Sequence, residues 1–237
     1  MQISQFIVII LFISLFSCGP SEEENIARAK SLLQTGQTDA AMALLDKIID
    51  ENSMNQPAYN LRGIARLENG KILEAIADLD ISVALDSNDY RAYYNRGNAY
   101  YQIEKFSEAI RDFDHAIRLE PRESDIYINR GNALVQLENY QSAIHDYTFA
   151  LKLDDGNYLT YFNLARAYYL MDNLDMAKTD FEQCIKIYST FAPAYYFLGM
   201  IALEKDEIES SCLFLQQASD LGYKQAAEVQ QLYCDQN

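Results

Sequence analysis

Arginine and aspartate recur together at a fixed spacing in the middle of the chain. Arg62, Arg96 and Arg130 stand 34 residues apart, and an aspartate follows each of them 16 residues later. A row of arginines could bind an anion. However, a partly buried guanidinium needs a carboxylate partner, and this spacing supplies one to each arginine. We therefore predict ion pairs inside the scaffold, with the aspartate partners Asp78, Asp112 and Asp146.

The histidines and the recognisable motifs give no sign of a catalytic or metal site. His115 and His145 belong to no set of histidine, cysteine and carboxylate residues at metal-ligand spacing. The sequence also has no glycine-rich phosphate loop and no nucleophile elbow, the sharp turn that presents a catalytic serine. We therefore predict a protein that is not an enzyme and needs no cofactor or metal, and we identify no small-molecule substrate.

The composition favours a helical protein that does not bind nucleic acid. Among 237 residues there are 18 tyrosines but only 4 prolines and 9 glycines, so few residues interrupt helices. The formal net charge is -16, from 35 acidic and 19 basic side chains. Such a chain would be repelled by the phosphates of nucleic acid.

The elements that must position these side chains come from a repeated sequence. Residues 93–121 contain two amphipathic runs, a polar break between them and a closing proline, which is the layout of a helical hairpin. Similar stretches begin at Tyr59 and at Tyr127, 34 residues to either side of Tyr93. A fixed period of this length indicates units that bury their apolar faces only against their neighbours.

The period divides most of the chain into six units without an insertion. Each unit has a small residue at its eighth position, another at its twentieth and a large apolar or aromatic residue at its twenty-fourth. The small residues let two helices approach closely, and the large side chain fills the space that remains. The units are 22–55, 56–89, 90–123, 124–157, 158–191 and 192–225.

This pattern, with a tyrosine at the fourth position of five units, resembles the tetratricopeptide repeat family. The resemblance implies an all-α fold: a right-handed solenoid of six helical hairpins. Residues 224–237 would add a capping helix and tail, because Ala226, Val229 and Leu232 recur at helical spacing. The terminal units depart from the pattern, as expected of units with one face toward water.

The resemblance also implies a concave groove lined by the first helix of each unit. Aromatic rings interleaved with amides could grip apolar side chains and hydrogen-bond a peptide backbone. Some of these rings could instead pack against the adjacent repeat. The predicted peptide-binding groove residues are Tyr94, Asn98, Tyr101, Gln102, Ile128, Asn132, Gln136, Phe162, Arg166, Tyr169 and Tyr196.

The beginning of the chain is typical of a secretion signal. Residues 1–17 contain an apolar run from 6 to 13, which is too short to cross a bilayer but suits a signal peptide. Residues 15–18, LFSC, resemble the lipobox of bacterial lipoproteins, and this implies lipid attachment at Cys18. Residues 18–21 would then form a lipidated tether.

Two further cysteines could form a disulfide. Cys212 and Cys234 lie 10 residues before and 12 residues after Gly222, so an antiparallel hairpin about this glycine would place them opposite each other. An oxidising envelope would allow the bond. Cys184 stands where two other units have alanine, so we expect it to be a core residue.

Together these features predict a non-catalytic scaffold or adaptor for protein–protein interaction. It would be a membrane-anchored lipoprotein of the bacterial cell envelope, with the outer membrane favoured and the periplasmic or surface face undecided. Its groove would bind a peptide segment of another envelope protein. Two alternatives stay open: an envelope assembly or secretion accessory that binds glycan or lipid, and a cytosolic adaptor held by an uncleaved signal anchor.

Overall fold

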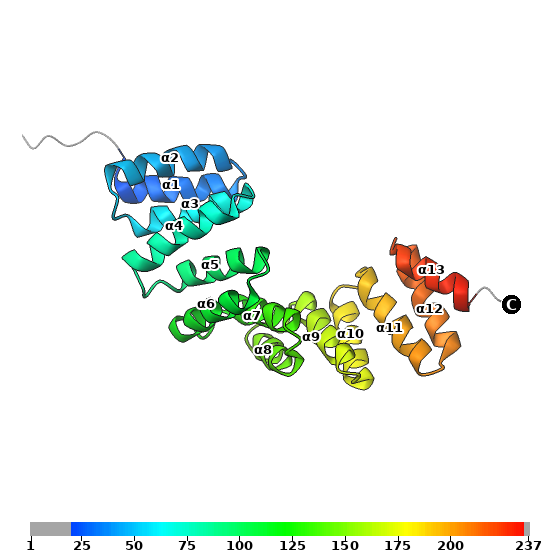
Figure 1. Ribbon diagram of the computed structural model, residues 1–237. Coiled ribbons are helices and arrows are strands. Elements are labelled where there is room, and N and C mark those ends of the chain that lie inside the picture. The colour runs from blue at the N-terminus through cyan, green and yellow to red at the C-terminus, as the bar shows by residue number, and fades with distance from the viewer. Residues whose placement is uncertain (1–19, 235–237) are drawn as a thin grey trace, which may run out of the picture.

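The computed structural model describes residues 20–234, which fold into helices without a strand (Figure 1). The predicted signal peptide and Cys18 lie outside these residues. The helices are α1 (Glu22–Gln34), α2 (Thr38–Glu51), α3 (Gln56–Glu68), α4 (Ile72–Leu85), α5 (Tyr90–Gln102), α6 (Phe106–Leu119), α7 (Ser124–Gln136), α8 (Tyr140–Leu153), α9 (Tyr158–Leu170), α10 (Leu174–Ile187), α11 (Ala192–Glu204), α12 (Ile208–Asp220) and α13 (Lys224–Tyr233).

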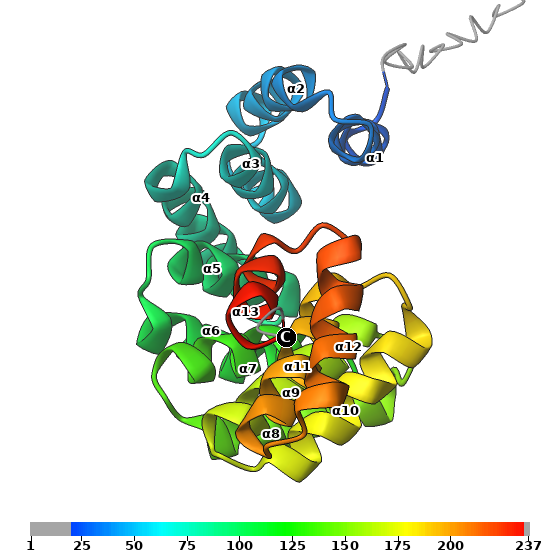
Figure 2. The same ribbon diagram turned by 90° about the vertical axis from the view of Figure 1, so that its right-hand side faces the viewer.

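Consecutive helices form antiparallel hairpins, and the hairpins stack along the chain (Figure 1). Each odd-numbered helix from α1 to α11 begins at the first residue of a predicted unit, and its even-numbered partner begins 16 residues later. Viewed along the stack, the hairpins form a curved array with the odd-numbered helices toward its inner side (Figure 2). The predicted solenoid of helical hairpins is therefore confirmed.

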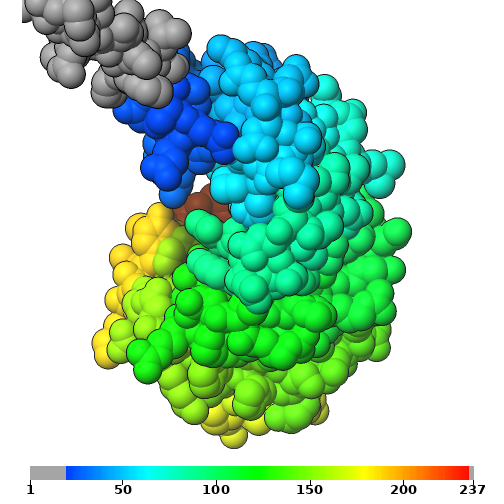
Figure 3. All heavy atoms as spheres, turned by 90° about the vertical axis from the view of Figure 1, so that its left-hand side faces the viewer, coloured from blue at the N-terminus to red at the C-terminus, as the bar shows by residue number. Residues whose placement is uncertain are grey.

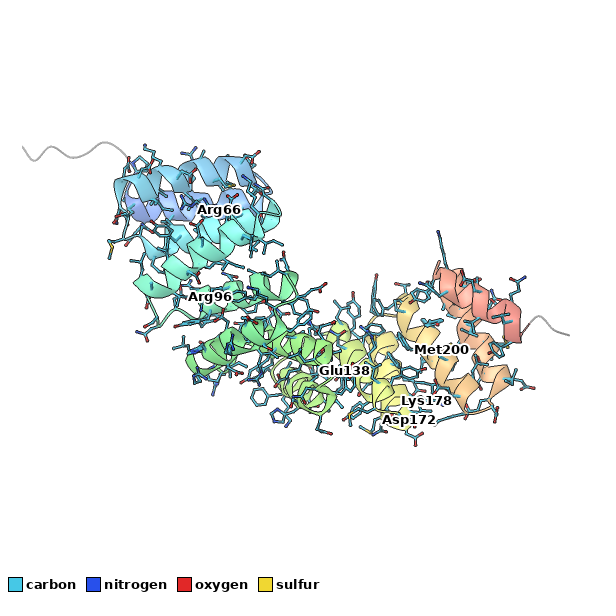
Figure 4. The ribbon with its side chains drawn as sticks, viewed as in Figure 1. Arg66, Arg96, Glu138, Asp172, Lys178 and Met200 are labelled. Atoms are coloured by element: carbon cyan, nitrogen blue, oxygen red, sulfur yellow. A yellow bond between two sulfur atoms is a disulfide. The ribbon has the colours of Figure 1, made fainter. Side chains whose placement is uncertain are left out.

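The link between the two helices of a hairpin has the same backbone geometry in all six described hairpins. Its central residue has a positive φ, and the next residue donates its N–H to the carbonyl five residues earlier, as Lys71 does to Arg66 at 2.8 Å. Glycine suits this left-handed backbone, and Gly36 and Gly70 occupy it in the first two units. The other four units have acidic residues there, two of them labelled in Figure 4: Glu104, Glu138, Asp172 and Asp206.

The small residue at the eighth position lies where the two helices of a hairpin pack closely. A Cβ atom added to Gly97 would lie 2.7 Å from Cε1 of Phe113, and one added to Gly131 would lie 2.7 Å from Cε1 of Tyr147. Both aromatic rings are almost completely buried. The large side chain at the twenty-fourth position therefore fits only because the eighth residue of the same unit is small.

The last helix covers the apolar end of the stack. Ala226 of α13 packs with Leu215 and Ala218 of α12, and all three side chains are fully buried. A disulfide joins Cys212 of α12 to Cys234 at the end of α13, with the two Cα atoms 5.7 Å apart. This bond ties the final helix to the helix that it covers.

Candidate functional site

The concave face of the solenoid is lined by α1, α3, α5, α7, α9 and α11. Asparagines from neighbouring helices meet there in pairs. The side-chain Nδ2 of Asn95 donates to Oδ1 of Asn60 at 2.9 Å. In the next pair, Nδ2 of Asn129 donates to Oδ1 of Asn98 at 2.9 Å. The row of amides then continues across α7 and α9, where Asn163 donates to Asn132 at 3.2 Å.

Each pair leaves hydrogen-bonding capacity that its own members do not use. An asparagine side chain has two N–H donors and an oxygen with two lone pairs. Within the described residues, Nδ2 of Asn132 donates to no protein group, and Oδ1 of Asn129 and of Asn163 accepts from none, whereas the Asn98 amide also hydrogen-bonds Tyr94. Free hydrogen-bond donors and acceptors therefore recur along the concave face. A bound polypeptide backbone needs such groups, because each of its residues carries an N–H and a carbonyl.

Two tyrosines fix the middle of this row. The hydroxyl of Tyr94 accepts a hydrogen bond from Asn129 at 2.9 Å. The hydroxyl of Tyr147, which comes from the outer helix α8, reaches through the hairpin and donates to Oδ1 of Asn132 at 2.7 Å. Burial raises the pKa of both hydroxyls, so they stay protonated at neutral pH. Tyr101 lies nearby and packs edge-on against Phe106, with 5.4 Å between the two ring centroids.

The predicted groove aromatics of the C-terminal half pack mainly against other side chains of the scaffold. The ring centroid of Phe162 lies 5.0 Å from that of Phe191 and 5.6 Å from that of Phe181. Tyr196 lies 5.0 Å from Tyr223, and the Tyr169 hydroxyl donates to Glu204. These three predicted groove residues therefore belong largely to the packing within and between the last two units, although each keeps part of its surface exposed.

The remaining predicted groove residues are more open. Arg166 is exposed, with its guanidinium carbon 5.8 Å from the centroid of Phe162, and it forms no ion pair with the described residues. It lines a hollow of about 60 Å³ together with Asn132 and Gln136. A hollow of about 230 Å³ includes Asn98, Tyr101 and Gln102. Gln102 and Gln136 are exposed, whereas Ile128 is half-buried against the core.

A larger hollow lies in the N-terminal half of the concave face, and Tyr94 is the one residue of its lining that the sequence analysis predicted. Its volume is about 390 Å³, and side chains from α1, α3, α5 and α7 line it. Asn60 and Ile64 stand at the fifth and ninth positions of their unit, as Tyr94 and Asn98 do in theirs. If the fifth and ninth positions of the first two units had also been taken as groove positions, the sequence would have predicted this part of the site.

The predicted arginine–aspartate pairs are confirmed and lie inside the hairpins. Arg96, labelled in Figure 4, donates from Nε and Nη2 to the two carboxylate oxygens of Asp112, both at 2.8 Å. Its Nη1 donates to Asp80 of the preceding unit at 2.7 Å. Arg62 and Arg130 make the same three bonds with Asp78, Asp46, Asp146 and Asp114. With their hydrogen bonds used in this way, the arginines join repeats and do not form an anion site.

The described residues hold no arrangement suited to catalysis by a metal. Within 20–234, no three histidine, cysteine or acidic side chains are grouped so as to bind a metal ion. His115 stacks on Tyr93 with 5.0 Å between ring centroids, and His145 lies 3.7 Å from Asp146. Burial raises the pKa of the Cys184 thiol to about 12, so the thiol is not a nucleophile at neutral pH.

Four models of the tetratricopeptide repeat match the sequence, over residues 26–90, 61–128, 124–157 and 158–191. The matched models include no enzyme family. No curated protein matches the chain.

Solved structures share the fold. YrrB, described as a tetratricopeptide repeat protein with an unusual peptide-binding site, is 25% identical with a TM-score of 0.69, over 79% of this chain and 97% of YrrB. The pilF protein of Pseudomonas aeruginosa is 18% identical with a TM-score of 0.76, over 86% of this chain and 95% of pilF. MamA is 22% identical with a TM-score of 0.66, over 70% and 96% of the two chains.

Proposed function

Because this chain is built from tetratricopeptide repeats, we propose that it is a protein-interaction scaffold that binds an extended peptide segment along its concave face. The observation that carries the proposal is the row of asparagine pairs on α3, α5, α7 and α9. Each pair holds its amides in fixed orientations and leaves donors or acceptors unused. A peptide backbone supplies the complementary groups, and hollows beside the row accept its side chains.

A relative supports the peptide nature of the ligand. YrrB is described as having a peptide-binding site, and it shares this fold over most of both chains. We expect Asn98, Gln102 and Gln136 to form hydrogen bonds with the ligand. Tyr94 and Tyr101 would provide apolar surface for its side chains. Arg166 would contact a ligand carbonyl or carboxylate, because it has no carboxylate partner among the described residues.

We further propose that the scaffold is a lipoprotein of the cell envelope, attached through Cys18. The argument is the apolar run and the LFSC sequence at residues 15–18. The disulfide between Cys212 and Cys234 supports an oxidising compartment, since such bonds persist outside the cytosol. Within residues 20–234, no helix combines the length and apolarity needed to cross a membrane. The intact mass of the membrane-extracted protein tests this: a mature chain that begins at acylated Cys18 is expected, and an unprocessed chain would contradict it.

A selection from a random peptide library tests the binding function. Full-length protein in detergent micelles would be immobilised, and the enriched peptides would be measured by fluorescence anisotropy. Replacing Asn98, Gln102 and Gln136 by alanine should weaken their binding by about tenfold or more, because several backbone hydrogen bonds are lost.

A matched variant controls for the removal of amides as such. Gln141, Gln183 and Gln217 lie on the outer helices α8, α10 and α12, and their replacement by alanine should leave binding unchanged. Equal losses in both triple variants would contradict a concave site. Enrichment of no peptide, with binding on a glycan array, would favour the glycan alternative instead.

A further inference from the structure

The N-terminal hollow of about 390 Å³ has an apolar floor. Ile26, Leu61 and Ile64 contribute aliphatic side chains, and Tyr90 and Tyr94 contribute rings. All five are half-buried, so they keep surface that a ligand could cover. Figure 3 shows the face of the molecule that opens into the interior of the array beside α1 and α3. The hollow is wide enough for an aliphatic side chain of a bound peptide.

Carboxylates surround this floor. Glu123 and Asp125, at the start of α7, line the hollow and form no ion pair with the described residues. An adjoining hollow of about 570 Å³ shares Ile26, Pro57, Asp89 and Arg91 with the first, and adds three acids: Glu22, Glu23 and Asp86.

The basic side chains of the two hollows do not balance these acids. Arg91 is bound to Asp89, with 2.7 Å between Nε and Oδ1, so this pair is neutral. Lys30 is the other basic residue that lines the hollows, and it forms no ion pair with the described residues. Five acids therefore remain against one lysine. The two hollows farther along the concave face, around Asn98 and Asn132, contain no carboxylate among their lining residues.

We propose that the N-terminal hollow selects ligand segments in which a lysine or arginine neighbours an aliphatic residue. This inference rests on the proposed function and specifies the ligand for one end of the groove. The aliphatic side chain enters the floor between Leu61, Ile64 and Tyr94. The basic side chain lies along the rim, where Glu123 and Asp125 meet its charge. The net charge of the whole chain, -16, adds an attraction for the same ligands at long range.

Three fluorescein-labelled peptides of equal length provide the test. They share the same leucines and serines, and carry lysine, glutamate or glutamine at the remaining positions. Anisotropy with the full-length protein should show the lysine peptide binding at least about tenfold tighter than the glutamate peptide, and weakening with added salt. Replacing Glu123 by Gln and Asp125 by Asn should remove most of this preference. Lys30→Glu should strengthen binding of the lysine peptide.

A charge-matched variant separates local recognition from net charge. Glu182→Gln with Glu228→Gln removes the same charge from α10 and α13, away from the hollow, and should change the preference little. Equal loss in the two double variants would overturn the inference, as would equal binding of the lysine and glutamate peptides. Those results would leave the peptide-binding function intact. Failure of all three peptides to bind, together with an empty library selection, would contradict the proposed function itself.

Discussion

Asp180 breaks the series of buried ion pairs. Asp78, Asp112 and Asp146 each receive two hydrogen bonds from an arginine on the facing helix. In the fifth unit Leu164 stands at the arginine position. Asp180 lies near Tyr161 and Tyr168 of α9, and its buried Oδ2 has no hydrogen-bond partner in the described structure. Burial raises the pKa of Asp180 to about 6.

Because of this raised pKa, the free energy of unfolding depends on pH. Unfolding returns the carboxyl to an ordinary pKa of about 4, so the folded state binds the proton more tightly. The favourable contribution is fully present below about pH 4 and is lost as the pH rises through about 6. Two pKa units would amount to about 3 kcal/mol, and partial solvation reduces the expected loss to about 1–2 kcal/mol.

Asp180→Asn should therefore stabilise the protein at neutral pH by about 1 kcal/mol, and should have little effect at acid pH. Urea unfolding at the two pH values measures the difference. The matched substitution Asp78→Asn should have the opposite sign at neutral pH, because it leaves the charges of Arg62 and Arg66 without their buried partner. A lower urea midpoint for both variants at neutral pH would show that Asp180 is not an unfavourable charge.

At the scale of the elements, the hairpin depends on one close contact. Gly97 and Gly131 leave no room for a Cβ atom beside the rings of Phe113 and Tyr147. Replacing either glycine by leucine should lower the free energy of unfolding by about 1–3 kcal/mol, through overpacking of the hairpin. Gly156→Ala is the control, because its Cβ would meet only the Asp154 side chain, at 3.4 Å. Unchanged urea midpoints for both leucine variants would contradict the described packing.

The elements show which features the sequence could predict and which it could not. The helices were predictable because a contact such as Gly97 against Phe113 requires a small and a large residue 16 positions apart in unit after unit. The left-handed turns were less visible, since Glu138 and Asp172 occupy a conformation that sequence analysis assigns to glycine. In the structure their N–H groups donate to the carbonyls of Val135 and Tyr169, within the backbone hydrogen bonds that end the preceding helix.

The site was predictable only in part for a different reason. The asparagine pairing depends on the rotation between successive repeats, and residue spacing does not define that rotation. Aromatic residues at groove positions can face the ligand or the scaffold itself, and in the structure Phe162 contacts the rings of Phe181 on α10 and Phe197 on α11. The absence of an arginine at Leu164 could be read from the sequence. The consequence, a buried aspartate without an arginine partner, became visible only because the structure shows that Asp180 is buried.

At the scale of the whole molecule, the disulfide determines how firmly the last helix is attached. A 22-residue separation between Cys212 and Cys234 corresponds to a stabilisation of about 3 kcal/mol in the chain-entropy model. Replacing both cysteines by serine should lower the stability of the C-terminal end by about this amount. Hydrogen exchange should then become faster in α12 and α13 while α5 to α8 keep their protection. Equally fast exchange along the whole chain would contradict a local clip.

The central claim is that ligands bind on the concave face, and site-specific photocrosslinking tests it most directly. A benzophenone amino acid would replace Asn98 or Gln136 on the inner helices, or Arg111 or His145 on the outer ones, where both side chains are exposed. A peptide from the library selection would be irradiated with each full-length variant. We predict crosslinks from positions 98 and 136 and none from 111 and 145. Crosslinks from the outer positions alone, or with equal yield from all four, would contradict a concave binding site.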